Sequence, residues 1–217
     1  MKTLLFQGDS ITDCGRDRNN EQNLGDGYPN ILGSKFAYEA DGDIKIYNKG
    51  VSGNRIVDVY ARIKSDIINL KPDYMSILIG VNDVWHEFGG HNGVDAEKFE
   101  KIYTMLIEEV KTALPDIKIM ILAPYVLEGD ATTATEEEPD RWNIFKTEVA
   151  KRAEASKRVA EKFGLPLVTL QDKFDAAAKR SGNTTAWTAE GVHPTHAGHE
   201  LIARAWLEGF EKLKNNN

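Results

Sequence analysis

Residues 3–12 read TLLFQGDSIT, an apolar run that changes abruptly into small and polar residues. The run Thr3–Gln7 is short and has no polar alternation, which is typical of a buried strand in a parallel sheet. Gly8, Asp9 and Ser10 follow directly. In an open α/β sheet, ligands bind outside the carboxyl ends of the strands. The stretch therefore predicts a parallel sheet and places a candidate reactive serine, Ser10, at its edge.

The same pattern recurs along the chain. Four further apolar runs predict strands at Ile44–Asn48, Tyr74–Ile79, Ile117–Ala123 and Leu165–Leu170. Amphipathic stretches between them predict helices at Tyr28–Ala40, Ile56–Leu70, Ala96–Leu114, Arg141–Phe163 and His196–Leu213. Strands that alternate with helices predict a three-layer α/β/α sandwich with a five-stranded parallel sheet. Because no linker or repeat interrupts this pattern, we expect residues 1–217 to form a single domain.

Composition and charge narrow the classes of partner. The formal net charge is −7, and the basic residues are scattered rather than clustered. Such a surface repels phosphate backbones and anionic lipids, so we expect neither nucleic acid nor a membrane as a partner.

Cys14 is the only cysteine, which excludes an intrachain disulfide and favours a reducing compartment, the cytoplasm. The N-terminal apolar run is too short for a secretory signal. The sequence is compatible with a homo-oligomer as well as with a monomer.

Residues able to do chemistry follow the predicted strands. Ser10 follows the first strand, Gly53 lies in the segment after the second, and Asn82 follows the third. His193 comes after the fifth strand and a short helix, with Glu190 three residues before it. Since the carboxyl ends of parallel strands meet at one edge, we expect these residues to lie close together. Together they provide the nucleophile, base, base orienter and N–H donors that acyl transfer requires.

Each residue type fits one role. Ser10, at the start of a helix, is the predicted nucleophile, and its own N–H can face a developing oxyanion. Gly53 lets the backbone approach a substrate without a Cβ, and Asn82 offers a side-chain N–H donor. His193 is the predicted base. Glu190 is close enough in a turn to accept the Nδ1 proton of His193 and fix its tautomer.

Structural interpretations of the same residues remain open. Ser10 could cap a helix, Gly53 could occupy a left-handed loop position, and Asn82 could be a turn residue. Ser52 lies in Gly-Val-Ser-Gly, which differs from the Gly-x-Ser-x-Gly elbow of α/β-hydrolases. Cys14 is one helical turn from Ser10 and fits a packing residue better than a nucleophile.

Three histidines near the C-terminus are of the residue type that binds zinc. His193, His196 and His199 lie within seven positions of one another. However, Pro194 opens a helix after His193, so we expect the three imidazoles to diverge and His199 to pack at the helix start.

Several strings of sequence resemble a known family. Gly8-Asp9-Ser10, Gly53, Gly80-Val81-Asn82-Asp83 and Val192-His193-Pro194 resemble the four sequence blocks of the SGNH (GDSL) hydrolase superfamily, over nearly the whole chain. The resemblance implies a flavodoxin-like fold, an acyl-serine intermediate on Ser10, and an oxyanion hole made by the N–H groups of Ser10 and Gly53 and the side chain of Asn82. The strings FQGDSITDCGR (6–16), NDVW (82–85) and ARA (203–205) are similar to an intracellular branch that contains acetylxylooligosaccharide esterases.

This resemblance implies a serine esterase that removes short acyl groups, above all acetyl, from plant-derived oligosaccharides such as xylooligosaccharides. It implies no metal and no organic cofactor. Candidate substrate contacts are Asp9, Trp85, His86 and Trp187, since tryptophan rings can stack on sugar faces. The alternatives are a lysophospholipase or thioesterase on the same scaffold, a deacetylase of another sugar, and a catalytically impaired carbohydrate-binding homologue.

Glu190 departs from the family pattern, which has an aspartate three residues before the histidine. Glutamate adds a methylene, so its carboxylate has to fold back to reach His193. The impaired homologue is the alternative that this departure favours.

Overall fold

Five parallel strands form the central sheet. In the computed structural model, which describes residues 1–215, these strands are β1 (Lys2–Gly8), β2 (Ile44–Asn48), β3 (Tyr74–Leu78), β4 (Lys118–Leu122) and β5 (Leu167–Val168). Their order across the sheet is β2-β1-β3-β4-β5, and every neighbouring pair is parallel. This is the flavodoxin-like order, so the predicted fold class is confirmed.

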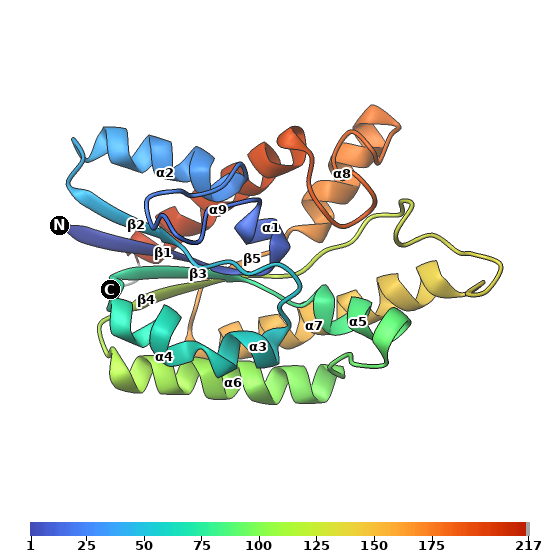
Figure 1. Ribbon diagram of the computed structural model, residues 1–217, viewed down its shortest axis with the longest axis horizontal. Helices are drawn as coiled ribbons and strands as arrows, with labels where there is room; N and C mark the ends of the chain where they lie inside the picture. The colour runs from blue at the N-terminus through green and yellow to red at the C-terminus, as the bar shows by residue number, and fades with distance from the viewer. Residues whose placement is uncertain (216–217) are drawn as a thin grey trace.

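Helices cover both faces of the sheet (Figure 1). One face is covered by α2 (Tyr28–Glu39), α8 (Gln171–Ser181) and α9 (His196–Asn215). The other is covered by α3 (Ile56–Ala61), α4 (Ile63–Asp66), α6 (Ala96–Ala113) and α7 (Arg141–Phe163). Two shorter helices, α1 (Ser10–Asp13) and α5 (Asn82–Gly90), begin just after β1 and β3. The first residues of α1 and α5 therefore lie at the carboxyl edge of the sheet.

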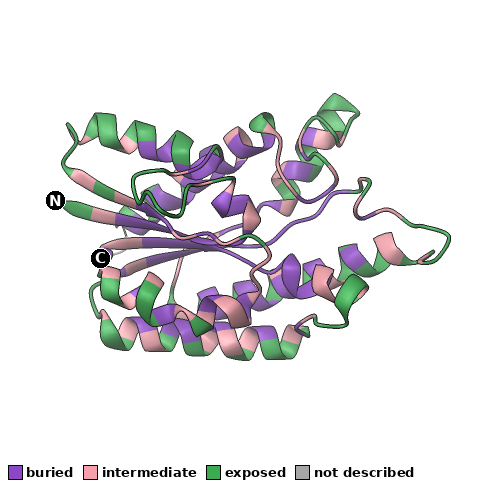
Figure 2. Ribbon diagram, in the orientation of Figure 1, coloured by how far each residue is buried: buried purple, intermediate pink, exposed green. Residues whose placement is uncertain are grey.

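The strands separate two hydrophobic cores because their side chains alternate between the faces. Leu4 and Phe6 of β1 belong to the core that includes Trp206 of α9, whereas Leu5 belongs to the core that includes Ile56 of α3. Figure 2 shows the sheet as buried toward the carboxyl ends of its strands, and the exposed residues on the outer sides of the helices, in loops and at the starts of β1 and β2. A sheet covered on both faces explains why Thr3–Gln7 of the inner strand β1 shows no polar alternation.

Two predicted elements differ from the structure. The helix expected at Ile56–Leu70 is divided into α3, α4 and a 3₁₀ turn, η1 (Ile68–Leu70). The first break falls at Arg62, whose backbone leaves helical geometry and whose Nε donates to the side chain of Asn54 at 2.8 Å. The predicted fifth strand is reduced to two residues at the edge of the sheet. Pro166, which has no N–H to donate to a ladder, precedes its first residue, and Leu170, shortly after its last, is already the N-cap residue of α8.

Candidate active site

Ser10 lies where β1 ends and α1 begins. Asp9 caps this helix, because its Oδ1 accepts the backbone N–H of Ile11 at 3.0 Å. The Oγ of Ser10 is 2.8 Å from Nε2 of His193, a residue 183 positions later in the chain. The structure thus brings the predicted nucleophile and the predicted base within hydrogen-bonding distance.

Glu190 contacts His193 twice. Its Oε1 contacts Nδ1 of the imidazole and accepts the backbone N–H of His193 at 3.0 Å. The longer glutamate side chain therefore folds back far enough to reach the ring. With the Nδ1 proton directed at Glu190, Nε2 is the acceptor for the hydroxyl of Ser10. This is the arrangement that a serine nucleophile and its base require.

The same contact shifts both pKa values in opposite directions. The hydrogen bond to Glu190 raises the pKa of His193 above its ordinary value of 6.5, although burial opposes the shift. Burial raises the pKa of Glu190, but hydrogen bonds from the His193 side chain and backbone outweigh burial and lower it overall. Because the two shifts move the pKa values further apart, Glu190 is already a carboxylate in the pH range in which His193 changes its charge, and it stabilises the imidazolium there.

A tight turn before α9 orients His193. The hydroxyl of Tyr125 donates to the carbonyl of Val192 at 3.1 Å, and the N–H of Leu127 donates to the carbonyl of Gly191 at 2.8 Å. Gly191 has φ +106°, and a Cβ there would lie 2.6 Å from the carbonyl oxygen of Leu127. Only glycine fits this position, because both the conformation and the space exclude a side chain.

Gly53 belongs to a second tight turn, beside the end of β1. The N–H of Asn54 donates to the carbonyl of Val51 at 3.1 Å, and Gly53 has φ +80°, which together define a type II turn. Val51 in turn donates its N–H to Gly8 of β1 at 3.1 Å, and the side-chain amide of Asn82 donates to the carbonyl of Asn54 at 3.1 Å. Within residues 1–215 the N–H of Gly53 donates to no protein acceptor. This N–H is therefore available to a ligand.

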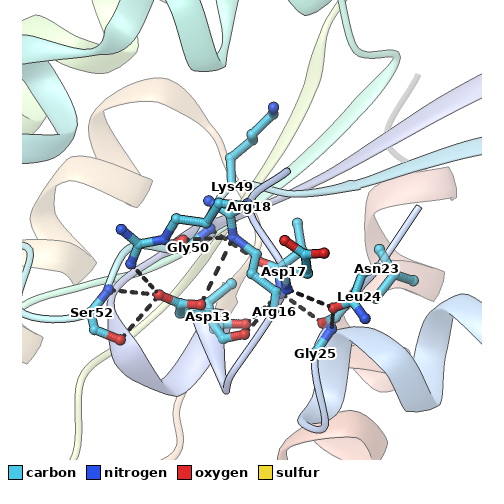
Figure 3. Close-up of polar contacts among 12 residues, drawn as sticks. Asp13, Arg16, Asp17, Arg18, Asn23, Leu24, Gly25, Lys49, Gly50 and Ser52 are labelled. Atoms are coloured by element: carbon cyan, nitrogen blue, oxygen red, sulfur yellow. Dashed lines mark hydrogen bonds and ion pairs between the residues drawn. The ribbon is translucent and has the colours of Figure 1, made fainter. Parts of the chain in front are cut away.

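Sequence reasoning missed the charged residues that hold this turn. The Nε of Arg16 donates to the carbonyl of Gly50 at 2.9 Å, and Arg62 donates to the side chains of Asn54 at 2.8 Å and Gln7 at 2.8 Å. Figure 3 shows Arg16 and Gly50 together with the surrounding polar contacts. Arg16 lies in the string 6–16 that resembles the esterase branch, and this was the only signal for it in the sequence.

A cavity adjoins the His193 side of the site. The ring of Trp85 lies 5.8 Å from the imidazole of His193, centre to centre. Trp85 and His86 also line a cavity of about 640 Å³, together with Phe88, Gly89, Gly90, Asn92, Glu137, Glu138 and Arg141. Arg141 is ion-paired with Glu138, and its guanidinium stacks 4.5 Å from the ring centre of Phe88. The cavity therefore combines an aromatic wall next to the base with polar groups further out.

Two of the four candidate substrate contacts, Asp9 and Trp187, do not line this cavity. Trp187 is not among the residues that line this cavity, and its indole N–H donates to the hydroxyl of Ser181 at 3.0 Å. Asp9 is only 1% exposed, which leaves it no surface to offer a substrate. Burial raises the pKa of Asp9 to about 7, and burial likewise raises the pKa of Asp83 to about 7.

Cys14 and His199 form a structural pair. The Nε2 of His199 is 3.3 Å from the sulfur of Cys14, and its Nδ1 accepts the backbone N–H of Tyr28 at 3.2 Å. Because Nδ1 is an acceptor, Nε2 holds the proton and cannot act as a base toward Cys14. Burial lowers the pKa of His199 to about 4 and raises that of Cys14. No cluster able to hold a metal ion occurs within residues 1–215.

Known proteins resemble this chain over nearly its whole length. The model of the GDSL-like lipase/acylhydrolase family matches residues 6–201. An acetylxylan esterase of Geobacillus stearothermophilus is 35% identical, with 98% of this chain and 96% of that protein covered.

Solved structures show the same likeness. LAE5, an α/β hydrolase enzyme from the metagenome of Lake Arreo, Spain, is 31% identical with a TM-score of 0.83, and the match covers 98% of this chain and 96% of LAE5. A catalytic mutant of Axe2, an acetylxylan esterase from Geobacillus stearothermophilus, is 34% identical with a TM-score of 0.81, covering 96% of this chain and 93% of Axe2. Catalytic mutants of Axe2 replace an aspartate or a serine by alanine.

Proposed function

Because this chain belongs to the GDSL-like lipase/acylhydrolase family, we propose that it is a serine esterase that removes acetyl groups from xylooligosaccharides or closely related plant oligosaccharides. The family match confirms the resemblance read from the sequence, and the chain is a carboxylic ester hydrolase. The observation that supports the proposal best is the contact of 2.8 Å between Ser10 and His193, with Glu190 behind the imidazole.

The proposed reaction has two steps. His193 removes the proton of Ser10 through Nε2, and the Ser10 oxygen attacks the acetyl carbon. The N–H groups of Ser10 and Gly53 and the amide of Asn82 stabilise the oxyanion of the tetrahedral intermediate. The imidazolium then protonates the sugar oxygen that leaves, and an acetyl-serine remains. In the second step His193 takes a proton from water, which attacks the acetyl carbon of this ester. The bond between that carbon and the Ser10 oxygen then breaks, the imidazolium returns the proton to Ser10, and acetate is released.

The Glu190–His193 contact argues against the impaired homologue. A glutamate that failed to reach the imidazole would leave the base without its orienting partner, whereas Oε1 of Glu190 contacts Nδ1. The imidazolium that forms during attack is thereby stabilised.

The sugar is proposed to lie against Trp85, in the cavity next to His193. Two features support this position: an aromatic ring that can stack on a sugar face, and polar side chains further out that can bond to hydroxyl groups. Glu137 and Glu138 outnumber Arg141 among the charged residues of the lining, which favours an uncharged sugar over an acidic one. His86 lines the same cavity and is proposed as a further substrate contact.

The compartment and domain organisation belong to the same proposal. A single cysteine supports a reducing compartment such as the cytoplasm. Two cores on one shared sheet support a single domain over residues 1–217, of which 216 and 217 lie outside the described part. In the part that is described, residues 1–215, we find no helix with the length and apolar character needed to cross a membrane.

Replacement of the nucleophile tests the proposal directly. The wild-type protein should release acetate from acetylated xylooligosaccharides, followed by mass spectrometry, and should be labelled by a fluorophosphonate. Ser10→Ala should abolish both turnover and labelling, whereas Ser34→Ala, at an exposed serine of α2, should change neither. Faster cleavage of octanoate than of acetate esters would favour a lysophospholipase or thioesterase. Labelling at Ser52 or Cys14 would contradict the assignment of Ser10.

A further inference from the structure

The carboxylate of Asp13 lies against the turn that holds Gly53, although the proposed reaction does not use it. Asp13 is the last residue of α1, the helix that begins with Ser10, and it is only 3% exposed. Its Oδ2 accepts the backbone N–H of Ser52 at 3.0 Å, the hydroxyl of Ser52 at 3.0 Å, and an N–H of Arg18 at 2.7 Å (Figure 3). Three donors thus meet on one buried oxygen.

These hydrogen bonds keep Asp13 ionised. Burial raises the pKa of Asp13, but the hydrogen bonds from Arg18 and Ser52 outweigh it and lower the pKa below its ordinary value of 3.8. The raised pKa of His193 lies far above this range. Asp13 is therefore an anion at every pH at which His193 changes its charge. Hydrogen bonds to a charged acceptor are stronger than those between neutral groups.

Ser52 stands directly before the peptide group that presents the N–H of Gly53. It is the second residue of the type II turn Val51–Asn54, and Gly53 is the third. The dihedral angles of type I and type II turns differ mainly by a rotation of this central peptide. Such a rotation would turn the N–H of Gly53 to the opposite side of the turn. The two hydrogen bonds that Ser52 donates to one fixed oxygen of Asp13 oppose that rotation.

We propose that Asp13 is a positioning residue of the oxyanion hole: it holds Ser52 so that the N–H of Gly53 stays directed toward the oxyanion formed at Ser10. The inference rests on the proposed function, because this N–H matters to catalysis only if an oxyanion forms there. The short helix α1 then has two tasks, since it presents Ser10 at one end and fixes the Gly53 turn from the other.

Three variants give graded expectations. Complete loss of an oxyanion donor lowers kcat by about 10²–10³-fold, so Asp13→Ala, which loosens one donor, should lower kcat by about 10–100-fold with KM changed less than about twofold. Ser52→Ala removes only the hydroxyl contact and should have a smaller effect. The Asp13→Ala/Ser52→Ala double variant should be no slower than Asp13→Ala, because both changes act on the same contact.

A transition-state analogue separates positioning from mere folding. A boronic acid forms a tetrahedral adduct with an active serine, so its inhibition constant should rise by the same factor by which kcat falls. Asp17→Asn is the matched control. Asp17 is an exposed carboxylate four residues after Asp13, in the loop that follows α1, and its Oδ1 accepts the N–H of Asn19 instead of a donor in the turn. This variant should leave kcat and the inhibition constant unchanged.

The experiment measures kcat, KM, inhibition and Tm on a chromogenic acetate ester with the full-length chain. An unchanged kcat in Asp13→Ala, an effect confined to KM, or a lower Tm with unchanged boronic acid inhibition would each overturn the inference. Should Asp13→Ala fail to fold, Ser52→Ala decides on its own, with a kcat lowered by about threefold or more as the supporting result. Failure of the proposed function is distinguishable, because the wild-type protein itself would then neither cleave the ester nor react with fluorophosphonate at Ser10.

Discussion

At the scale of single residues, the contact between Glu190 and His193 predicts the pH dependence of the reaction. The base must be neutral to accept the proton of Ser10, so kcat/KM rises as pH increases through the pKa of His193. Because the hydrogen bond from His193 to Glu190 raises that pKa above 6.5, the midpoint of this rise should lie above pH 6.5. Glu190→Gln removes the charge that stabilises the imidazolium, so the midpoint should move to lower pH. The plateau of kcat should also fall, by up to about 10⁴-fold, because the wrong tautomer is favoured.

The conservative variant provides the control for this prediction. Glu190→Asp keeps the carboxylate, so it should retain both the higher midpoint and most of the activity. A pH–rate profile of the three proteins, with far-UV circular dichroism to confirm the fold, makes the comparison. An identical midpoint and plateau in wild type and Glu190→Gln would mean that another acceptor orients His193.

Some residues of the candidate site could be predicted from the sequence, and others could not. Ser10 and His193 could be paired because each follows a strand of one parallel sheet, and the sheet brings the strand ends together. Asp13 and Arg16 could not be assigned, since their role depends on a loop contact and no periodicity records it. Trp187 was expected to contact the substrate because it follows the fifth strand. Its indole N–H donates to Ser181 instead, and the residue does not line the cavity next to His193.

At the scale of elements, the turn before α9 is predicted to tolerate no side chain at Gly191. Gly191→Ala would place a Cβ 2.6 Å from the carbonyl of Leu127 in a backbone conformation with φ +106°. The turn has to shift, and Glu190 and His193 shift with it. We expect kcat to fall by at least about tenfold and unfolding free energy to fall by about 2 kcal/mol or more, measured by kinetics and urea denaturation.

Gly182 offers a matched control for this turn. It also has a positive φ, +67°, but a Cβ there would meet nothing within 4 Å. Gly182→Ala should therefore cost only about 1 kcal/mol of stability, from the left-handed conformation, and leave kcat unchanged. Equal loss of kcat in the two variants would show that stability, and not the position of His193, controls the effect.

Element boundaries were predictable where the chain obeys local rules. Arg141–Phe163 and Ile44–Asn48 have the predicted limits, because an amphipathic helix has a distinct period and a short apolar run predicts a strand. The prediction of one helix at Ile56–Leu70 was wrong because a tertiary contact interrupts it. Arg62 leaves helical geometry and donates hydrogen bonds to the side chains of Asn54 and Gln7. No helix was predicted at α5, because its nine residues are too few to show a clear amphipathic period. Its first residue, Asn82, was predicted to belong to the site only because it follows a strand.

At the scale of the whole molecule, the buried carboxyl group of Asp83 predicts that stability decreases as the pH rises from about 4 to about 7. Burial raises the pKa of Asp83 from 3.8 to about 7. Between these values the unfolded chain has lost the proton and the folded protein still holds it, so the free energy of unfolding falls as pH rises. Asp83→Asn cannot ionise and should lose less stability between pH 5 and pH 8. We expect a difference of about 1 kcal/mol or more, because one pKa unit corresponds to about 1.4 kcal/mol.

Urea denaturation at both pH values measures this difference. Asp116→Asn, at an exposed aspartate before β4, should follow the wild type. Parallel stability curves for wild type and Asp83→Asn would show that Asp83 keeps the same protonation in the folded and unfolded protein.

The parallel direction of all five strands has a practical consequence. Every residue of the proposed triad and oxyanion hole lies beyond the carboxyl ends of the strands, whereas β1 starts and α9 ends at the opposite edge (Figure 1). A surface linkage near either of those ends would therefore leave the reactive edge facing bulk solution. Immobilised on beads through such a linkage, the protein should present its catalytic face to dissolved polysaccharide fragments in a flow reactor without a spacer arm.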